Sequence, residues 1–185
     1  MSLELIIGPM FAGKTSALVG RLKRYKFIGY KCFVITHASD VRYSTVGSIV
    51  THDQDSFPAH PTNALMPLLS HPEYIAAKII AVEEAHFFDD LLEFVTAAIE
   101  THGKQVLCVG LNGDYRRKPI GQILDLVPLA DIIHKVDALC PYCPVPTVAH
   151  FTFRRKDLGS SDAQILVGGA DKYEALCRKH YIEFF

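Results

Sequence analysis

Residues 8–15, GPMFAGKT, match the phosphate-loop pattern GxxxxGKT, and this stretch decides the fold. The apolar run LELII at residues 3–7 comes directly before it, and a stretch with Leu18, Leu22 and Tyr25 at helical spacing follows it. A strand, a glycine-rich loop and a helix in that order are the context in which this motif binds a nucleotide. Because both flanking elements are present, we disfavour the alternative of an accidental glycine-rich turn.

The residue types of the loop suggest a division of labour. Glycines let backbone N–H groups turn inward around a triphosphate, and the N-terminus of the following helix adds partial positive charge. We expect Lys14 to reach the terminal phosphates and the Thr15 hydroxyl to bind magnesium. The predicted phosphate-binding residues are Gly8, Pro9, Met10, Phe11, Ala12, Gly13, Lys14 and Thr15.

The chain continues as alternating strands and helices. Residues 31–36 (KCFVIT), 78–82 (KIIAV) and 105–111 are short apolar runs typical of buried strands, and residues 89–102 predict a helix with one apolar face. Residues 37–61 are polar, which favours a long loop with one short hairpin. The opening strand, helix and strand predict a parallel pair. The expected fold class is α/β, a parallel sheet of the P-loop NTPase type flanked by helices.

Composition excludes several classes of protein. The 185 residues are 49% apolar and carry a formal net charge of -1, which argues against a disordered tail and against a strongly basic chain that binds nucleic acid. The longest apolar runs are far shorter than the roughly 20 residues of a membrane helix. No basic segment precedes an apolar run at the N-terminus, so we expect no secretory signal and a cytoplasmic location.

Two adjacent acids, Glu83 and Glu84, end the predicted strand KIIAV. The carboxyl end of a parallel strand faces the crevice in which such sheets bind ligands. Glu83 suits the acid that holds magnesium, directly or through water, and Glu84 suits a group that orients or deprotonates an attacking hydroxyl. Ordinary surface glutamates are the alternative, disfavoured by the phosphate loop in the same sheet.

A second constellation lies near the C-terminus, in Cys140-x-x-Cys143 and Cys177-x-x-His180. Three thiolates and one imidazole are the ligand set of a closed tetrahedral zinc site. A dithiol redox site is the alternative for the CPYC segment, but such a site opens a helix, which Pro144 and Pro146 oppose. We therefore favour zinc. The change in sequence pattern near residue 136 predicts two domains, 1–136 for nucleotide binding and 137–185 for the zinc-binding part.

Five motifs in order resemble the thymidine kinases of the cytosolic and poxvirus type, the type II family. They are GPMFAGKT, the D-x-R-Y segment of Asp40, Arg42 and Tyr43, VEEAHFFDD, LNGDYRRKPIG and the cysteine-bracketed tail with LVGGADKY. The resemblance covers nearly the whole chain. It implies ATP-dependent phosphorylation of the 5'-hydroxyl of thymidine in nucleotide salvage, with Mg2+ and a structural Zn2+. Glu84 would be the general base, and Arg42 would reach the transferred phosphate.

The resemblance also implies a nucleoside pocket. In the family, a lasso loop tied at its base by zinc closes over the base, and residues 164–168 would present backbone groups to the pyrimidine edge. The implied nucleoside-binding residues are Phe87, Leu111, Tyr115, Ile120, Thr152, Gln164, Ile165, Leu166, Val167, Gly168 and Tyr173. The family further implies a homotetramer and inhibition by the end product dTTP, with no nucleic-acid or membrane partner.

The chain departs from the family pattern at several positions. Glu83 stands where the family has Asp, His86 where it often has Gln, and His180 where it often has a fourth Cys. Tyr115 and Ile120 stand where Phe is common, so the pocket gains a hydroxyl. The extra methylene of Glu83 favours a water-mediated contact with magnesium.

Two other functions fit parts of the sequence. A P-loop ATPase acting on nucleic acid would use the basic cluster of Arg21, Lys23, Arg24 and Lys26, which we interpret instead as a solvated helix face. A zinc module that senses nucleotides without catalysis would show no nucleoside-dependent release of ADP.

Overall fold

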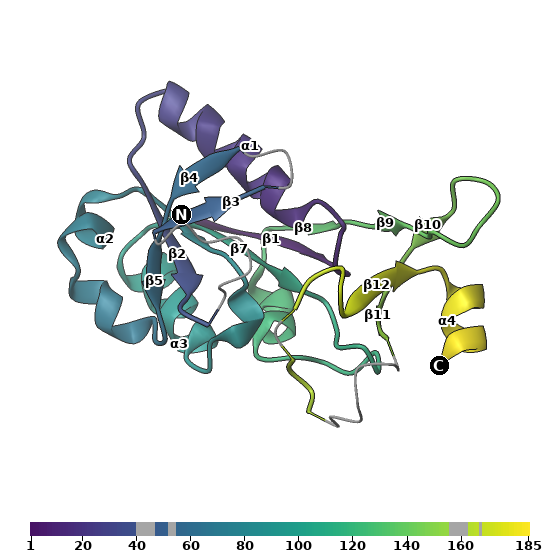
Figure 1. Cartoon of the computed structure of the whole chain (residues 1–185). Coiled ribbons are helices and arrows are strands. Elements are labelled where there is room, and N and C mark those ends of the chain that lie inside the picture. Colours follow the sequence, from purple (N-terminus) through teal and green to yellow (C-terminus); the bar gives the residue numbers. More distant parts are fainter. Residues whose placement is uncertain (40–46, 52–54, 156–162, 167) are drawn as a thin grey trace.

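The computed structural model describes residues 1–39, 47–51, 55–155, 163–166 and 168–185 (Figure 1). Its centre is a six-stranded sheet in the order β5-β2-β6-β7-β1-β8. All the pairings within this sheet are parallel. The strands are β1 (Ser2–Gly8), β2 (Cys32–His37), β5 (His60–Thr62), β6 (Ile79–Val82), β7 (Gln105–Leu111) and β8 (Ile132–Lys135). The predicted α/β class is confirmed.

The sequence prediction of the sheet was wrong in two respects. β1 and β2 are parallel but not neighbours, because β6 and β7 lie between them. The edge strands β5 and β8 were not predicted. β5 contains a proline inside a polar stretch, and β8 exposes both of its isoleucines, so neither has the apolar pattern of a buried strand.

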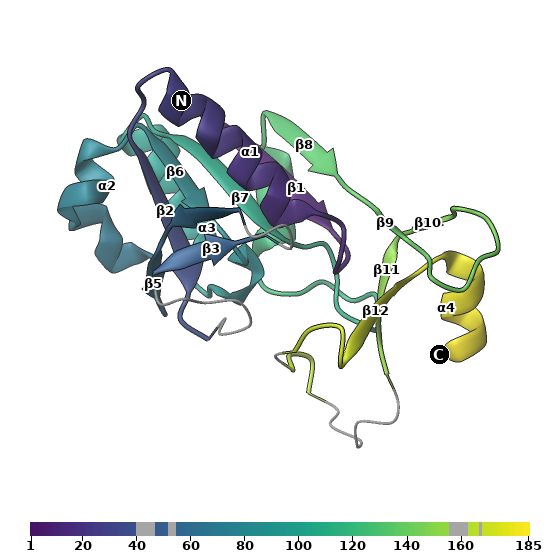
Figure 2. The same ribbon diagram turned by 45° about the horizontal axis from the view of Figure 1, so that its top comes forward.

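Both faces of the sheet are covered, as a parallel sheet requires (Figure 2). Helix α1 (Lys14–Phe27) packs Leu18, Val19 and Leu22 on one face, together with Ile49 and Phe57 of a small hairpin. That hairpin, β3 (Ser48–Val50) and β4 (Ser56–Pro58), confirms the predicted one. The opposite face packs against η1 (Met66–Ser70), α2 (Pro72–Ala76), α3 (Leu91–Thr96) and η4 (Ile123–Leu129).

The helix predicted at residues 89–102 begins at Leu91 and changes its winding part-way. α3 is followed without a break by the π-helical turn η3 (Ala97–Thr101), and Gly103 then turns the chain at a positive φ of 61°. The short 3-10 helix η2 (Ala85–Phe87) follows β6 directly. The turn of η2 therefore places His86 and Phe87, which follow the acids Glu83 and Glu84, at the edge of the sheet.

The C-terminal part forms two small antiparallel pairs and a helix, set to one side of the sheet in both views (Figures 1 and 2). β9 (Ala138–Leu139) pairs with β10 (Val148–Ala149), and β11 (Phe151–Arg154) pairs with β12 (Tyr173–Leu176). The single strand predicted at residues 148–153 is thus two strands with different partners. α4 (Arg178–Phe184) closes the chain and packs Tyr181 into the core of this part.

No helix among the described residues has both the length and the apolar character to cross a membrane.

Two buried weak acids, a thiol and a phenol, are expected to make the fold less stable at high pH. Burial raises the pKa of the Cys108 thiol on β7 and raises the pKa of Tyr74 on α2 to about 12. Below about pH 8 both groups are protonated in the folded and unfolded states and have no effect. Above that, the unfolded chain loses these protons first, so the free energy of unfolding should fall by up to about 1.4 kcal/mol per pH unit for each group.

Urea unfolding of the wild type and of Cys108→Ala between pH 8 and pH 11 measures this effect. The variant should show the shallower dependence on pH, whereas Cys32→Ala, at a half-buried thiol, should change the slope less. Equal slopes in the wild type and Cys108→Ala would contradict the assignment.

Candidate active site and metal centre

The phosphate loop connects the end of β1 to the start of α1. Phe11 and Gly13 both have positive φ, 63° and 68°, which turns the backbone sharply before the first helical residue. The ammonium of Lys14 is buried and donates to the Pro9 carbonyl oxygen at 2.6 Å, so the side chain reaches back across the loop. This geometry places a cation and a helix N-terminus at one turn, the arrangement that favours phosphate groups.

Three residues of the loop contact other parts of the chain. A Cβ at Gly8 would lie 2.3 Å from the Val136 carbonyl oxygen, so only glycine allows this close approach of the chain after β8. The Met10 N–H donates to the Thr152 hydroxyl at 3.0 Å, and Phe11 packs against the C-terminal core. The loop is thereby joined directly to β11 of the C-terminal part.

The Thr15 hydroxyl donates to Glu83 Oε1 at 2.5 Å. The two residues are 68 positions apart in sequence, and they meet because α1 begins at the same edge of the sheet at which β6 ends. A hydroxyl and a buried carboxylate are hard oxygen ligands of the kind that Mg2+ prefers. The two residues predicted to bind magnesium therefore meet at one point beside the phosphate loop.

Glu84 follows at the turn from β6 into η2. It has the left-handed backbone conformation, φ 50° and ψ 41°, which is uncommon for a residue with a side chain and clusters at functional sites. Its Oε2 lies 3.5 Å from Nδ1 of His86, and that nitrogen accepts the Leu111 N–H at 3.2 Å. In neutral His86 the proton therefore belongs on Nε2.

Two glycines make room for His86, which is almost fully buried. A Cβ at Gly121 would lie 2.1 Å from the His86 carbonyl oxygen, and one at Gly110 would lie 2.9 Å from its Nδ1. Gly121 also has a positive φ of 56°. The turn that carries Glu84 is therefore packed closely against β7 and the loop after it.

A cavity of about 40 Å³ opens next to this turn. Ten of the eleven residues implied for nucleoside binding line it, and the eleventh, Val167, lies outside the described residues. The lining also includes Met10 of the phosphate loop and two residues that the sequence analysis did not place in the site, His86 and Asp114. Met10 thus belongs to both the phosphate loop and the cavity wall.

The loop between β11 and β12, residues 155–172, is called the lasso loop below, and its described part is held across the cavity by side-chain contacts. Gln164 Nε2 donates to Asp114 Oδ2 at 3.0 Å and to the Pro119 carbonyl oxygen at 2.9 Å. The buried Asp114 also accepts the backbone N–H groups of Arg116 and Lys118, both at 2.8 Å, which shapes the turn after β7. Asp114 could have been suspected from the motif LNGDYRRKPIG, since Asp commonly organises such turns.

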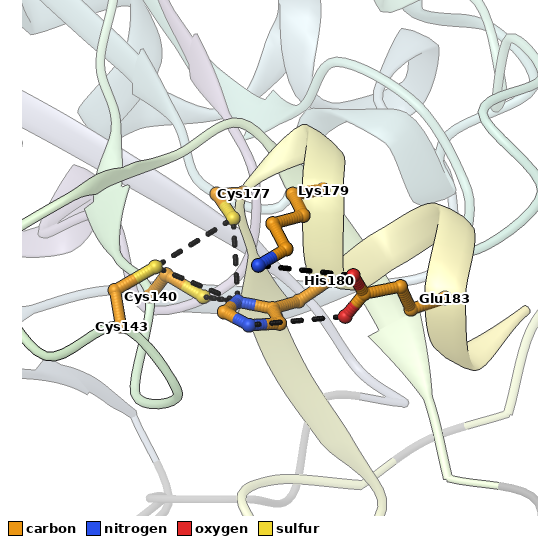
Figure 3. A network of polar contacts seen from close by, with 6 residues as sticks. All are labelled: Cys140, Cys143, Cys177, Lys179, His180 and Glu183. Atoms are coloured by element: carbon orange, nitrogen blue, oxygen red, sulfur yellow. Dashed lines mark hydrogen bonds and ion pairs between the residues drawn. The ribbon is translucent and has the colours of Figure 1, made fainter.

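Cys140, Cys143, Cys177 and His180 converge in the C-terminal part, with all four ligand atoms within 4.8 Å of one another (Figure 3). Nδ1 of His180 lies 3.3, 3.5 and 3.4 Å from the sulfurs of Cys140, Cys143 and Cys177, and the sulfurs of Cys143 and Cys177 are 3.8 Å apart. Zinc bonds of about 2.3 Å to sulfur and 2.0 Å to nitrogen at tetrahedral angles give separations of about 3.8 and 3.5 Å. The cluster therefore fits zinc.

The local chemistry also suits a metal. The backbone N–H of His180 lowers the pKa of Cys177 to about 7, which favours the thiolate that binds metal. Glu183 Oε2 lies 4.0 Å from Nε2 of His180, on the side of the ring away from the thiols (Figure 3). The CPYC segment forms a turn between β9 and β10 and opens no helix, unlike a dithiol redox site.

The chain is similar to known thymidine kinases over nearly its whole length. The family model described as thymidine kinase matches residues 1–181. The chain belongs to the thymidine kinase family. It is 39% identical to the cytosolic thymidine kinase of Homo sapiens over 98% of this chain and 73% of that protein. It is 37% identical to the cytosolic enzyme of Gallus gallus, covering 77% of it, and 36% identical to the thymidine kinase of variola virus, covering 97%.

Membership of the thymidine kinase family makes the chain a transferase that phosphorylates thymidine in nucleotide salvage. Part of the basic cluster on α1 is held by contacts within the chain. Arg21 pairs with Glu4, Lys23 lies 2.7 Å from Asp55, and Lys26 lies over the Phe57 ring. These three cations are engaged within the chain.

Some predicted site residues cannot be placed. Asp40, Arg42 and Tyr43 of the D-x-R-Y segment lie outside the described residues, as does Val167. Arg154, in contrast, is described and lies behind the cavity wall, although no sequence pattern predicted it there. Its sequence context, FRRK, resembles any exposed basic stretch, so the sequence contains no signal that one of these cations is buried.

Proposed function

We propose that the protein transfers the γ-phosphoryl group of ATP to the 5'-hydroxyl of thymidine and releases thymidine monophosphate. This proposal rests on the position of Met10, which belongs to the phosphate loop and also lines the cavity beside it. A donor bound at the loop and a nucleoside bound in the cavity would have their reacting groups next to one another. Such positioning, with charge neutralisation, accounts for most of the rate of a phosphoryl transfer.

In this proposal Glu84 accepts the proton of the 5'-hydroxyl as the new O–P bond forms. An alcohol is a weak nucleophile at neutral pH, and a carboxylate within hydrogen-bond reach removes this obstacle. Thr15 and Glu83 would hold Mg2+, which supplies charge neutralisation at the phosphates when bound. Lys14 would contact the terminal phosphates, and Arg42 would neutralise charge on the transferred group.

The nucleoside would lie between apolar side chains on one side and the lasso loop on the other. Main-chain N–H and C=O groups of residues 164–168 would pair with the pyrimidine edge, and a mismatched edge would leave buried polar groups unpaired at a cost of about 1 to 3 kcal/mol each. The division at residues 136 and 137 would separate a donor-binding domain from the zinc-tied domain that closes over the acceptor.

The family resemblance supports three further elements of the proposal. They are a homotetrameric assembly, inhibition by dTTP and a cytoplasmic location, the last in keeping with relatives named cytosolic.

A panel of nucleosides with ATP and Mg2+ tests the proposed function. We expect monophosphate from thymidine, release of ADP only when a nucleoside is present, and no product from purine nucleosides, whose larger base should not fit between the side chains that surround the pyrimidine. ATP hydrolysis that DNA stimulates without any nucleoside would contradict the proposal and favour a nucleic-acid motor.

A further inference from the structure

Arg154 is the last residue of β11 and lies opposite Tyr173 of β12 at the base of the lasso loop. It is only 8% exposed, although the next residue, Arg155, is exposed. Burying a guanidinium costs several kcal/mol unless hydrogen bonds compensate for the lost water. A buried arginine at this place therefore calls for a specific set of partners.

The guanidinium of Arg154 donates hydrogen bonds to three residues, and two of them line the cavity. Nη1 donates to the Ala163 carbonyl oxygen at 2.7 Å, and Nη2 donates to the carbonyl oxygen of Gln164 and to the Tyr173 hydroxyl, both at 3.0 Å. The Tyr173 hydroxyl in turn donates to the Leu166 carbonyl oxygen at 2.6 Å. Arg154 thus holds two carbonyl groups of the lasso loop directly and a third, that of Leu166, through the Tyr173 hydroxyl.

The same guanidinium lies over the ring of Tyr115, with 3.9 Å between Cζ and the ring centroid. This is a cation–π contact at a buried place. Tyr115, Gln164, Leu166 and Tyr173 all line the cavity, whereas Arg154 is not among its described lining residues. Arg154 therefore supports the wall from behind.

We propose that Arg154 is a positioning residue that determines the affinity and the base selectivity of the thymidine pocket; this inference rests on the proposed function. Thymine and cytosine present opposite donor and acceptor groups at positions 3 and 4 of the ring. A main chain held rigidly can match only one of these patterns, since the other leaves buried groups unpaired. Arginine is suited to hold this main chain in place, because its planar guanidinium group donates hydrogen bonds in two directions while its face stacks on an aromatic ring.

Arg154→Lys tests this role, and Arg155→Lys is the matched control. The lysine keeps the charge, but one ammonium cannot hold both carbonyl groups and the Tyr173 hydroxyl while stacking on Tyr115. We expect the KM for thymidine and the dissociation constant of thymidine from calorimetry to rise by about tenfold or more, the factor for one lost charge-assisted hydrogen bond. The preference for thymidine over deoxycytidine in kcat/KM should fall in parallel.

Arg155 pairs with Glu174 at the surface of the same hairpin, so Arg155→Lys should change each constant by less than about twofold. The KM for ATP and the zinc content should be unchanged in both variants. A merely structural role of Arg154 would reduce the active fraction, and hence kcat, without changing the KM for thymidine or the base preference.

Tyr173→Phe provides a second test that conserves the shape of the wall. It removes the hydroxyl between Arg154 and Leu166, and the base preference should change in the same direction by a smaller factor. An unchanged KM for thymidine in Arg154→Lys, an equal rise in the KM values of thymidine and ATP, or an unchanged base preference in Tyr173→Phe would each overturn the inference. Absence of thymidine phosphorylation by the wild type would instead refute the proposed function.

Discussion

Glu84→Gln is expected to lower the kcat for thymidine phosphorylation by about 100-fold to 10,000-fold, the usual contribution of a general base. The amide has the shape of the carboxylate but does not accept the proton of the 5'-hydroxyl. Glutamate and glutamine are equally strained by the left-handed backbone at position 84, where φ is 50°, so the substitution should not affect the fold. Single-turnover kinetics with saturating ATP and thymidine would measure the chemical step directly.

Binding measurements separate catalysis from folding in this variant. The dissociation constant of ATP should be close to that of the wild type, because Lys14, Thr15 and Glu83 are unchanged. Glu93→Gln, at an exposed position on α3, is the matched control and should retain full turnover. Near-normal turnover in Glu84→Gln would refute the assignment of the base, and loss of ATP binding would show that Glu84 acts at the phosphates.

Cys177→Ser is expected to reduce the zinc content from about one ion per chain towards zero and to abolish thymidine binding. The cluster loses one of its four ligands, and Cys177 links the end of β12 to the start of α4. Structural zinc contributes apparent binding free energies of about 10 to 16 kcal/mol in small zinc domains, so this part of the chain should unfold without the metal.

Metal analysis combined with limited proteolysis would test this prediction. Cleavage should concentrate after residue 136, while the six-stranded sheet, whose cores are separate from the C-terminal core, should remain protected. Cys32→Ser is the matched control, because Cys32 is also a free thiol but lies outside the cluster. Stoichiometric zinc in Cys177→Ser would place the metal elsewhere.

Short-range patterns explain why much of this protein could be predicted. The strand, phosphate loop and helix at the N-terminus are specified by neighbouring residues, because glycine positions and apolar spacing act locally. The cysteine and histidine cluster was recognisable for a similar reason, since two pairs with short spacing supply four donor atoms of the kind that zinc binds. The edge strands β5 and β8 were not predicted, because a strand that is hydrogen-bonded to only one neighbouring strand does not need a continuous apolar run.

The sequence by itself determined the α/β class, the phosphate-loop motif, the strand-end acids and the candidate zinc ligands, because each depends on residues that are neighbours in the sequence. Only the tertiary structure decided that Thr15 meets Glu83, that Met10 lies in the cavity wall, and that Arg154 is buried beneath the lasso loop. These contacts join segments that are close together only because of the order of the strands in the sheet. A short stretch of sequence does not specify that order. A buried arginine and an exposed one are the same letter in the sequence, and packing alone distinguishes Arg154 from Arg155.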